Sequence, residues 1–148
     1  MSKESFENEK KEGEYKVYHK NGNLSVLKYY KNGKLEGELK KWDEKGNLEY
    51  LYTLKNGKLN GEWKTWWENQ TLKSHSFYNQ EGHLDGTLKT WRDDGSLEGE
   101  YHYKNGDLHG HYKEWDKDYE LTLHEYYIEG CKVDTYYKKK TQDKNLKK

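Results

Sequence analysis

The chain has 148 residues, of which only 30% are hydrophobic and 36% are charged, so it lacks the aliphatic residues for a thick core. It contains no Ala or Pro, yet 16% of its residues are aromatic and 14 are Gly. Disordered chains are poor in aromatic residues, so this composition indicates a folded chain with an aromatic interior and frequent turns.

The charges are balanced in number but not in position. There are 27 Lys and Arg against 27 Asp and Glu. Residues 138–148 contain six Lys and one Asp, a net charge of +5, so residues 1–137 carry −5. Cys131 has no partner for an internal disulfide, no apolar run approaches the ~18 residues needed to cross a membrane, and the N-terminus lacks an apolar leader. We therefore expect a cytoplasmic protein.

In chain order, a charged extension (1–12) precedes a repeated motif that consists of Gly, any residue, an aromatic residue or Leu, Lys, any residue and an aromatic residue. The motif glycines are Gly13, Gly37, Gly61, Gly86 and Gly110, at spacings of 24, 24, 25 and 24 residues, and an eroded sixth copy begins at Asp134. Positions are counted below from the motif glycine, so that Gly+5 is the fifth residue after it. A 24-residue repeat over most of the chain predicts a repeat architecture.

Each unit contains two turn signals, which are Asn-Gly or related pairs. These pairs are Asn21-Gly22, Asn32-Gly33, Lys45-Gly46, Asn56-Gly57, Asn69-Gln70, Glu81-Gly82, Asp94-Gly95, Asn105-Gly106, Asp118-Tyr119 and Glu129-Gly130. Asn-Gly and Asp-Gly are strong hairpin signals because type I′ turns need positive φ at both central residues. The segments between the turns have strand length and alternate in polarity. The sequence thus predicts an all-β fold: an elongated, single-layer antiparallel β-meander of stacked hairpins, with about eleven strands.

The most distinctive side chains form a stripe at Gly+5, which comprises Tyr18, Trp42, Trp66, Trp91 and Trp115, with Trp63 and Trp67 close by in sequence. The parity of Gly+5 is opposite to that of Gly+2. Either the stripe faces the other side of the sheet, or a β-bulge returns it to the same side. The stripe is either an internal stacking ladder or a ridge of partly exposed rings for binding a partner, with Glu14, Glu38 and Glu62 in its polar rim.

The alternation of Gly-Glu-(Trp/Leu/Tyr)-Lys-x-(Trp/Tyr) with Tyr-x-Asn-Gly-Lys-Leu-x-Gly resembles MORN repeats, and most closely their bacterial variant, over residues 13–137. This resemblance implies a single-layer sheet of hairpins. It also implies a non-enzymatic protein-binding module similar to antitoxin or immunity proteins, which neutralise a cognate toxin by occluding it. The acidic body fits a basic toxin such as a nuclease. The alternative is a structural or membrane-associated scaffold, which the acidic charge of residues 1–137 disfavours.

Signatures of catalysis are absent: there is no nucleophile motif, and no phosphate-binding loop opens a helix. We expect no enzyme, no cofactor and no nucleic-acid partner. One alternative is a metal site, because a two-residue turn at Asn105-Gly106 would bring His102 opposite His109 with His111 diagonal. The competing interpretation places these histidines at variable polar positions on a solvated face, and we expect no metal.

The Lys-rich tail (138–148) has two interpretations. It is either a basic arm for an acidic partner or protection of the last strand against edge-to-edge pairing. Because Lys138 to Lys140 directly extend the last predicted strand, we favour edge protection and a tail docked on the sheet.

Overall fold

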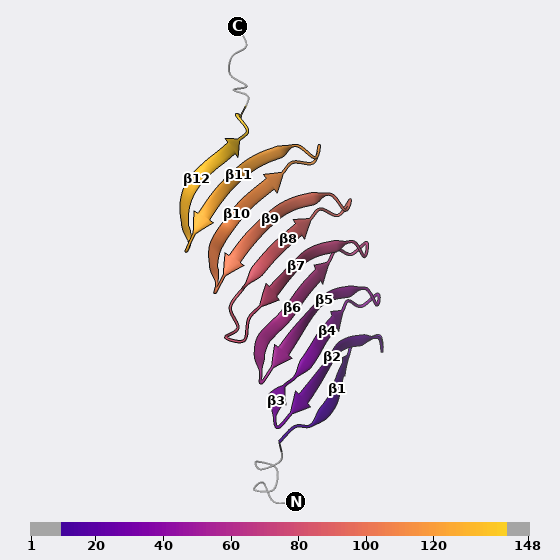
Figure 1. Ribbon diagram of the computed structural model, residues 1–148. Coiled ribbons are helices and arrows are strands. Elements are labelled where there is room, and N and C mark those ends of the chain that lie inside the picture. Colours follow the sequence, from indigo (N-terminus) through magenta and orange to yellow (C-terminus); the bar gives the residue numbers. More distant parts are fainter. Residues whose placement is uncertain (1–9, 142–148) are drawn as a thin grey trace, which may run out of the picture.

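The computed structural model describes residues 10–141 as one antiparallel sheet in a single layer, with no helix in this range (Figure 1). The rest of the predicted N-terminal extension (1–9) and of the tail (142–148) lies outside the described residues. The strands are β1 (Gly13–Tyr18), β2 (Leu24–Lys31), β3 (Lys34–Leu35), β4 (Gly37–Trp42), β5 (Leu48–Lys55), β6 (Lys58–Trp66), β7 (Leu72–Tyr78), β8 (Gly86–Trp91), β9 (Leu97–Lys104), β10 (Asp107–Trp115), β11 (Leu121–Ile128) and β12 (Cys131–Lys138).

The strands follow one another across the sheet in chain order, so β1 and β12 lie at opposite ends (Figure 1). Eleven strands form the hydrogen-bonded path, and the two-residue β3 pairs beside it with β2. β3 and β4 correspond to one predicted strand that is interrupted at Glu36. The predicted all-β meander of about eleven strands is therefore confirmed.

The two edges at which the strands turn use different turns, with one exception: the turn between β7 and β8 is a four-residue turn, Asn79–Gly82, at the edge where the other turns have two residues. At one edge, which we call the tight-turn edge, two-residue turns such as Asn32-Gly33 and Asn56-Gly57 have positive φ at both residues (51° and 78°; 51° and 79°). At the other, the wide-turn edge, four-residue turns such as Asp43–Gly46 have a single left-handed residue, and Gly46 N–H donates to the Asp43 carbonyl (3.1 Å). Two wide turns lack the glycine, and Gln70 and Tyr119 adopt φ of 72° and 63° in its place.

A β-bulge lies at Gly+5 in all five units. In β6 and β7, Thr65 is opposite Ser74, but Trp66 is opposite Leu72, so Lys73 is an extra residue on the return strand. The same shift sets every Gly+5 aromatic residue opposite a leucine. The pairs are Tyr18–Leu24, Trp42–Leu48, Trp66–Leu72, Trp91–Leu97 and Trp115–Leu121.

The buried material lies on one face of the sheet, the ladder face, where the Gly+2 residues pair with tyrosines of the return strands. Trp63 lies between Tyr52 and Tyr78, with ring centroids 5.5 and 5.7 Å apart. Tyr112 likewise lies between Tyr101 and Tyr127, at 4.5 and 5.7 Å. The core is thin: in residues 10–141 only two hydrophobic residues, Leu39 and Leu54, are buried. Aromatic cross-strand rows thus replace an aliphatic core, as the composition predicts.

The opposite face, the lysine face, carries one lysine per unit at Gly+3. The lysines are Lys16, Lys40, Lys64, Lys89 and Lys113. In the first three units a glutamate at Gly+1 pairs with the lysine of its own strand, as Glu14 does with Lys16 (2.9 Å). These pairs are partly exposed, so they contribute little to stability and mainly keep this face solvated.

Candidate functional site

The Gly+5 stripe lies along the wide-turn edge. Its four tryptophans are half-buried and Tyr18 is 58% exposed. No pair of stacked rings within residues 10–141 includes a stripe residue, because the ring ladder is built by the Gly+2 residues. The stripe is therefore a row of aromatic–leucine pairs, each of which retains some exposed surface.

Trp63 and Trp67 differ from the stripe and from each other. Trp63, at Gly+2, is a member of the ladder on β6. Trp67, at Gly+6, begins a wide turn, and its indole N–H donates to the carbonyl of Trp91 in the next unit (2.9 Å). The Lys73 ammonium lies 4.3 Å from the centroid of the Trp67 ring, a cation–π distance.

Trp66 and Trp67 together line a shallow hollow of about 550 Å³ at the wide-turn edge. The other lining residues are Asp43, Asn47, Leu48, Glu49, Tyr50, Thr65, Glu68 and Lys73. Three of them are carboxylates and one is a lysine. Glu49 and Glu68 also approach lysines of the neighbouring strand and turn, since Lys41 is 3.5 Å from Glu49 and Lys45 is 2.9 Å from Glu68. The hollow thus combines indole walls with an acidic rim.

Side chains at Gly+6 tie successive units together along this edge. The His19 ring nitrogen lies 2.8 Å from the Trp42 carbonyl, and the Arg92 guanidinium donates to the Trp115 carbonyl (2.5 Å). Trp67 makes the equivalent contact in the third unit. The backbone carbonyls of Trp42, Trp91 and Trp115 are therefore held by side chains of the preceding unit.

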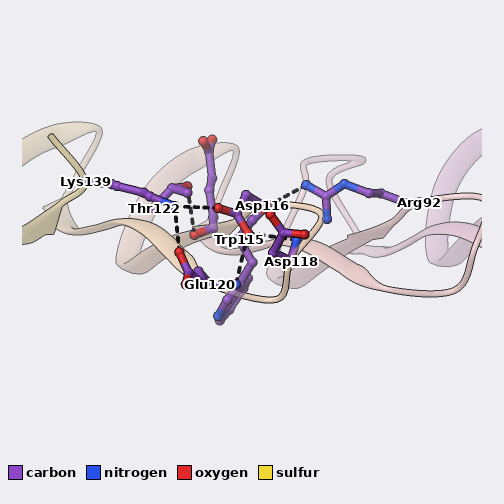
Figure 2. A network of polar contacts seen from close by, with 8 residues as sticks. Arg92, Trp115, Asp116, Asp118, Glu120, Thr122 and Lys139 are labelled. Carbon is purple, nitrogen blue, oxygen red and sulfur yellow. Dashed lines mark hydrogen bonds and ion pairs between the residues drawn. The ribbon is translucent and has the colours of Figure 1, made fainter. Parts of the chain in front are cut away.

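The beginning of the Lys-rich segment docks on the last wide turn, as Figure 2 shows. The Lys139 ammonium lies 2.8 Å from Asp116 and 2.7 Å from Glu120, and its backbone N–H donates to Thr122 (2.8 Å). Hydrogen bonds to these carboxylates raise the pKa of Lys139, and the same lysine is the main cause of the lowered pKa of Asp116. Lys138 belongs to β12 itself.

The three histidines of the alternative metal site do not converge. His102 contacts the His111 carbonyl through its ring nitrogen (2.8 Å), while His109 accepts from the Glu129 backbone N–H (3.3 Å). His111 turns toward His124 instead (2.9 Å between ring nitrogens). Within the described range, no group of three or more His, Cys, Asp or Glu side chains is arranged to hold a metal ion.

At the C-terminal end of the ladder, two tyrosines donate to carboxylates on their own strands. Tyr112 donates to Glu114 (2.6 Å) and Tyr127 to Glu125 (2.7 Å), and Glu125 is buried. Burial is the main cause that raises the pKa of Tyr112, and the Glu114 carboxylate raises it further. Both hydroxyls remain protonated at neutral pH and fix the carboxylates over the ladder.

The residue before the motif glycine, which the sequence predicts to be a variable polar position on a solvated face, has a defined role. The residue before the motif glycine accepts the N–H at the tip of the next tight turn, as Glu12 does from Asn32 (2.7 Å), Glu36 from Asn56 (2.8 Å) and Asp85 from Asn105 (3.0 Å). The signal was present, because this position carries a hydrogen-bond acceptor in every unit. Its partner, however, is 20 residues away.

The structure defines the class of protein: an open β-repeat array that offers faces, edges and a shallow hollow for binding. The chain belongs to the MORN repeat variant family, which matches residues 11–32, 25–39, 35–56, 59–80 and 84–105, more than half of its length. The unit at Gly110 lies beyond these ranges but has the same strand register and bulge. MORN repeats are non-catalytic modules that bind proteins or membranes.

A search of curated proteins found no match to this chain. The part of the chain that the structure describes contains no helix long and apolar enough to span a membrane.

Proposed function

We propose that this protein is an antitoxin or immunity protein of the bacterial type, which acts in the cytoplasm by binding a toxin and covering its active site. The observation that carries the proposal is the hollow at Trp66 and Trp67, where two indoles and an acidic rim occur together on the surface. Tryptophan is enriched at binding hot spots because it buries a large area with little loss of entropy.

The chemistry of the hollow fits a basic partner. Lys73 already lies over the Trp67 ring, which shows that this ring accepts a cation. An Arg or Lys from a partner would take the place of Lys73 and face Glu49 and Glu68 at the rim. The net charge of −5 on residues 1–137 would steer a basic protein, such as a nuclease, toward this surface.

The mechanism is occlusion with one protein bound per toxin, and the chain contributes no chemistry of its own. The stripe extends the contact surface beyond the hollow on both sides, from Tyr18 to Trp115. A row of half-exposed rings on a twisted sheet would bury a broad area of the toxin and exclude substrate from its cleft.

The test is co-expression with the product of the adjacent gene in a host that the toxin kills, followed by isolation of the complex. We expect growth to be rescued and a complex of defined stoichiometry to form. If the product of the adjacent gene is harmless and forms no complex, the antitoxin proposal fails.

Two variants test the hollow. Trp66→Ala should weaken toxin binding roughly 30-fold, the loss typical of a hot spot. Glu49→Lys should also weaken it, whereas Glu98→Lys is the matched control, since Glu98 holds the equivalent bulge position two units away. Unchanged affinity in folded Trp66→Ala and Glu49→Lys variants would move the binding surface elsewhere.

The second candidate function is a membrane-associated scaffold, and the lysine face is the observation that favours it. No carboxylate lies within ion-pair distance of Lys113 in the described residues, and His111 replaces the Gly+1 glutamate in this unit. Flotation of the full chain with phosphatidylserine vesicles, compared with a Lys89→Gln/Lys113→Gln variant, tests this function. Flotation that this variant loses would favour the scaffold over the antitoxin.

A further inference from the structure

The sheet has two ends, and neither end strand has a second neighbour in residues 10–141. All six residues of β1 and all eight of β12 are exposed. An exposed edge strand offers unpaired backbone N–H and C=O groups to any strand that can align with it. The two ends differ in how well they are protected against such pairing.

The β12 edge is irregular. Val133 and Tyr136 are extra residues that interrupt its register with β11, and Lys132 and Lys138 stand on it. Bulges and lysines are devices that discourage pairing at an edge. In contrast, β1 keeps an unbroken register with β2 from Gly13 to Val17, with its only shift at Tyr18. Within residues 10–141, the open edge of the sheet is therefore β1.

The sequence of β1 is complementary to itself. In an antiparallel pair centred on Tyr15, Glu14 of each copy lies opposite Lys16 of the other, on the lysine face. These side chains are half-exposed and already interact within one chain (2.9 Å). Centring the pair on Glu14 or on Lys16 would instead set like charges opposite each other, which is destabilising.

The ladder face is complementary in the same register. Tyr15 is the first ring of the ladder, 5.0 Å from Tyr30 and 37% exposed, so a second Tyr15 opposite it would continue the aromatic row. Val17, which is 46% exposed, would lie opposite Gly13, where no heavy atom lies within 4 Å of the position of a Cβ. Both faces are thus complementary in the register centred on Tyr15.

We propose that two copies of this chain associate through β1, antiparallel and centred on Tyr15, to form one continuous sheet with a β12 strand at each outer end. This interface is separate from the hollow and does not depend on the toxin proposal. One strand pairing buries less area than a standard interface, so the dimer is weak and depends on concentration.

The test is sedimentation velocity of the full chain over a concentration series. Wild-type protein should shift from monomer to dimer as concentration rises. Glu14→Lys alone sets lysines opposite lysines, and Lys16→Glu alone sets glutamates opposite glutamates. Each should weaken self-association roughly tenfold, because two attractive cross-strand pairs become repulsive.

Mixing the two variants provides the decisive result. Every pair in the mixed dimer joins opposite charges, so the heterodimer should form with about wild-type affinity. This outcome also shows that both variants are folded. Glu38→Lys and Lys40→Glu are the matched controls, since they occupy the same positions on β4, which has a strand on each side. A monomer at every concentration, a dimer that ignores the single changes, or a mixture without heterodimer would overturn the proposal.

Discussion

Replacing Glu36 with Ala should destabilise the protein by about 1 kcal/mol, because it removes one of two hydrogen bonds that join successive tight turns. The Glu36 carboxylate accepts the Asn56 N–H (2.8 Å), and beside it the Leu35 carbonyl accepts the Gly57 N–H (2.9 Å). The substitution leaves the second bond intact. A hydrogen bond to a charged group contributes roughly 1.5–3 kcal/mol, but the Asn56 N–H is exposed and water can replace the acceptor. The expected loss of stability, about 1 kcal/mol, is therefore smaller than that range.

Urea denaturation followed by tryptophan fluorescence measures this loss, and thermal unfolding should show a decrease of roughly 2–4 °C for a chain of this size. The matched control is Glu38→Ala, which removes the same charge two residues away, on β4. Glu38 pairs only with the partly exposed Lys40 (3.4 Å), so its removal should change stability by less than about 0.5 kcal/mol. If the two variants lose equal stability, the carboxylate of Glu36 does not support the turn, and its effect is one of charge alone.

Two further predictions concern charge. The pKa of His75 lies below its usual value, mainly because of burial and also because of Lys64 and Lys89, so the unfolded chain binds the proton more readily. The free energy of unfolding should therefore fall as pH is lowered from about 7 to 5. His75→Leu should make that fall smaller, as measured by urea titrations at both pH values. Leucine is the residue at the equivalent position of the second unit, Leu51. Lys139→Ala should speed amide hydrogen exchange in β12 at low salt and much less at high salt, because salt screens the ion pairs of Lys139 with Asp116 and Glu120. Lys140→Ala should leave the exchange rate unchanged.

The fold could be predicted from local signals because the determinants of this sheet are local. A turn such as Asn56-Gly57 needs positive φ at two adjacent residues, and that requirement is visible in the residue types themselves. The 24-residue period then fixed the order of the strands, since each hairpin contacts only its neighbours. The bulge at Gly+5 could be anticipated from the unequal arms, but its place on the return strand could not.

The candidate site was less predictable because its contacts cross from one unit to the next. Gly+2 and Gly+5 both carry aromatic residues, and only the register shows that Trp63 stacks in the ladder while Trp66 pairs with Leu72 at the edge. The role of Glu36 was hidden for the same reason, because its partner belongs to another hairpin. A residue type that repeats every 24 residues indicates that its position is important, but it does not identify the residue that this side chain contacts.

Different residue types at Gly+6 join successive units, as His19, Trp67 and Arg92 do, so a side chain found there in one unit alone can have a second role. At Gly+6 only the third unit has a tryptophan, Trp67, and its indole forms the second wall of the hollow. His19 occupies the same position in the first unit and contacts the Trp42 carbonyl (2.8 Å).

Trp67→His should therefore keep the hydrogen bond to the next unit while it replaces the indole wall under Lys73 with a smaller imidazole. We expect the free energy of unfolding to change by less than about 1 kcal/mol, the value of one such hydrogen bond, while toxin affinity falls roughly tenfold or more. Denaturation and binding titrations on the same preparation measure both. An affinity that stays constant would mean that Trp67 serves only to join the units, and that the acidic rim, not the indole, is what the partner recognises.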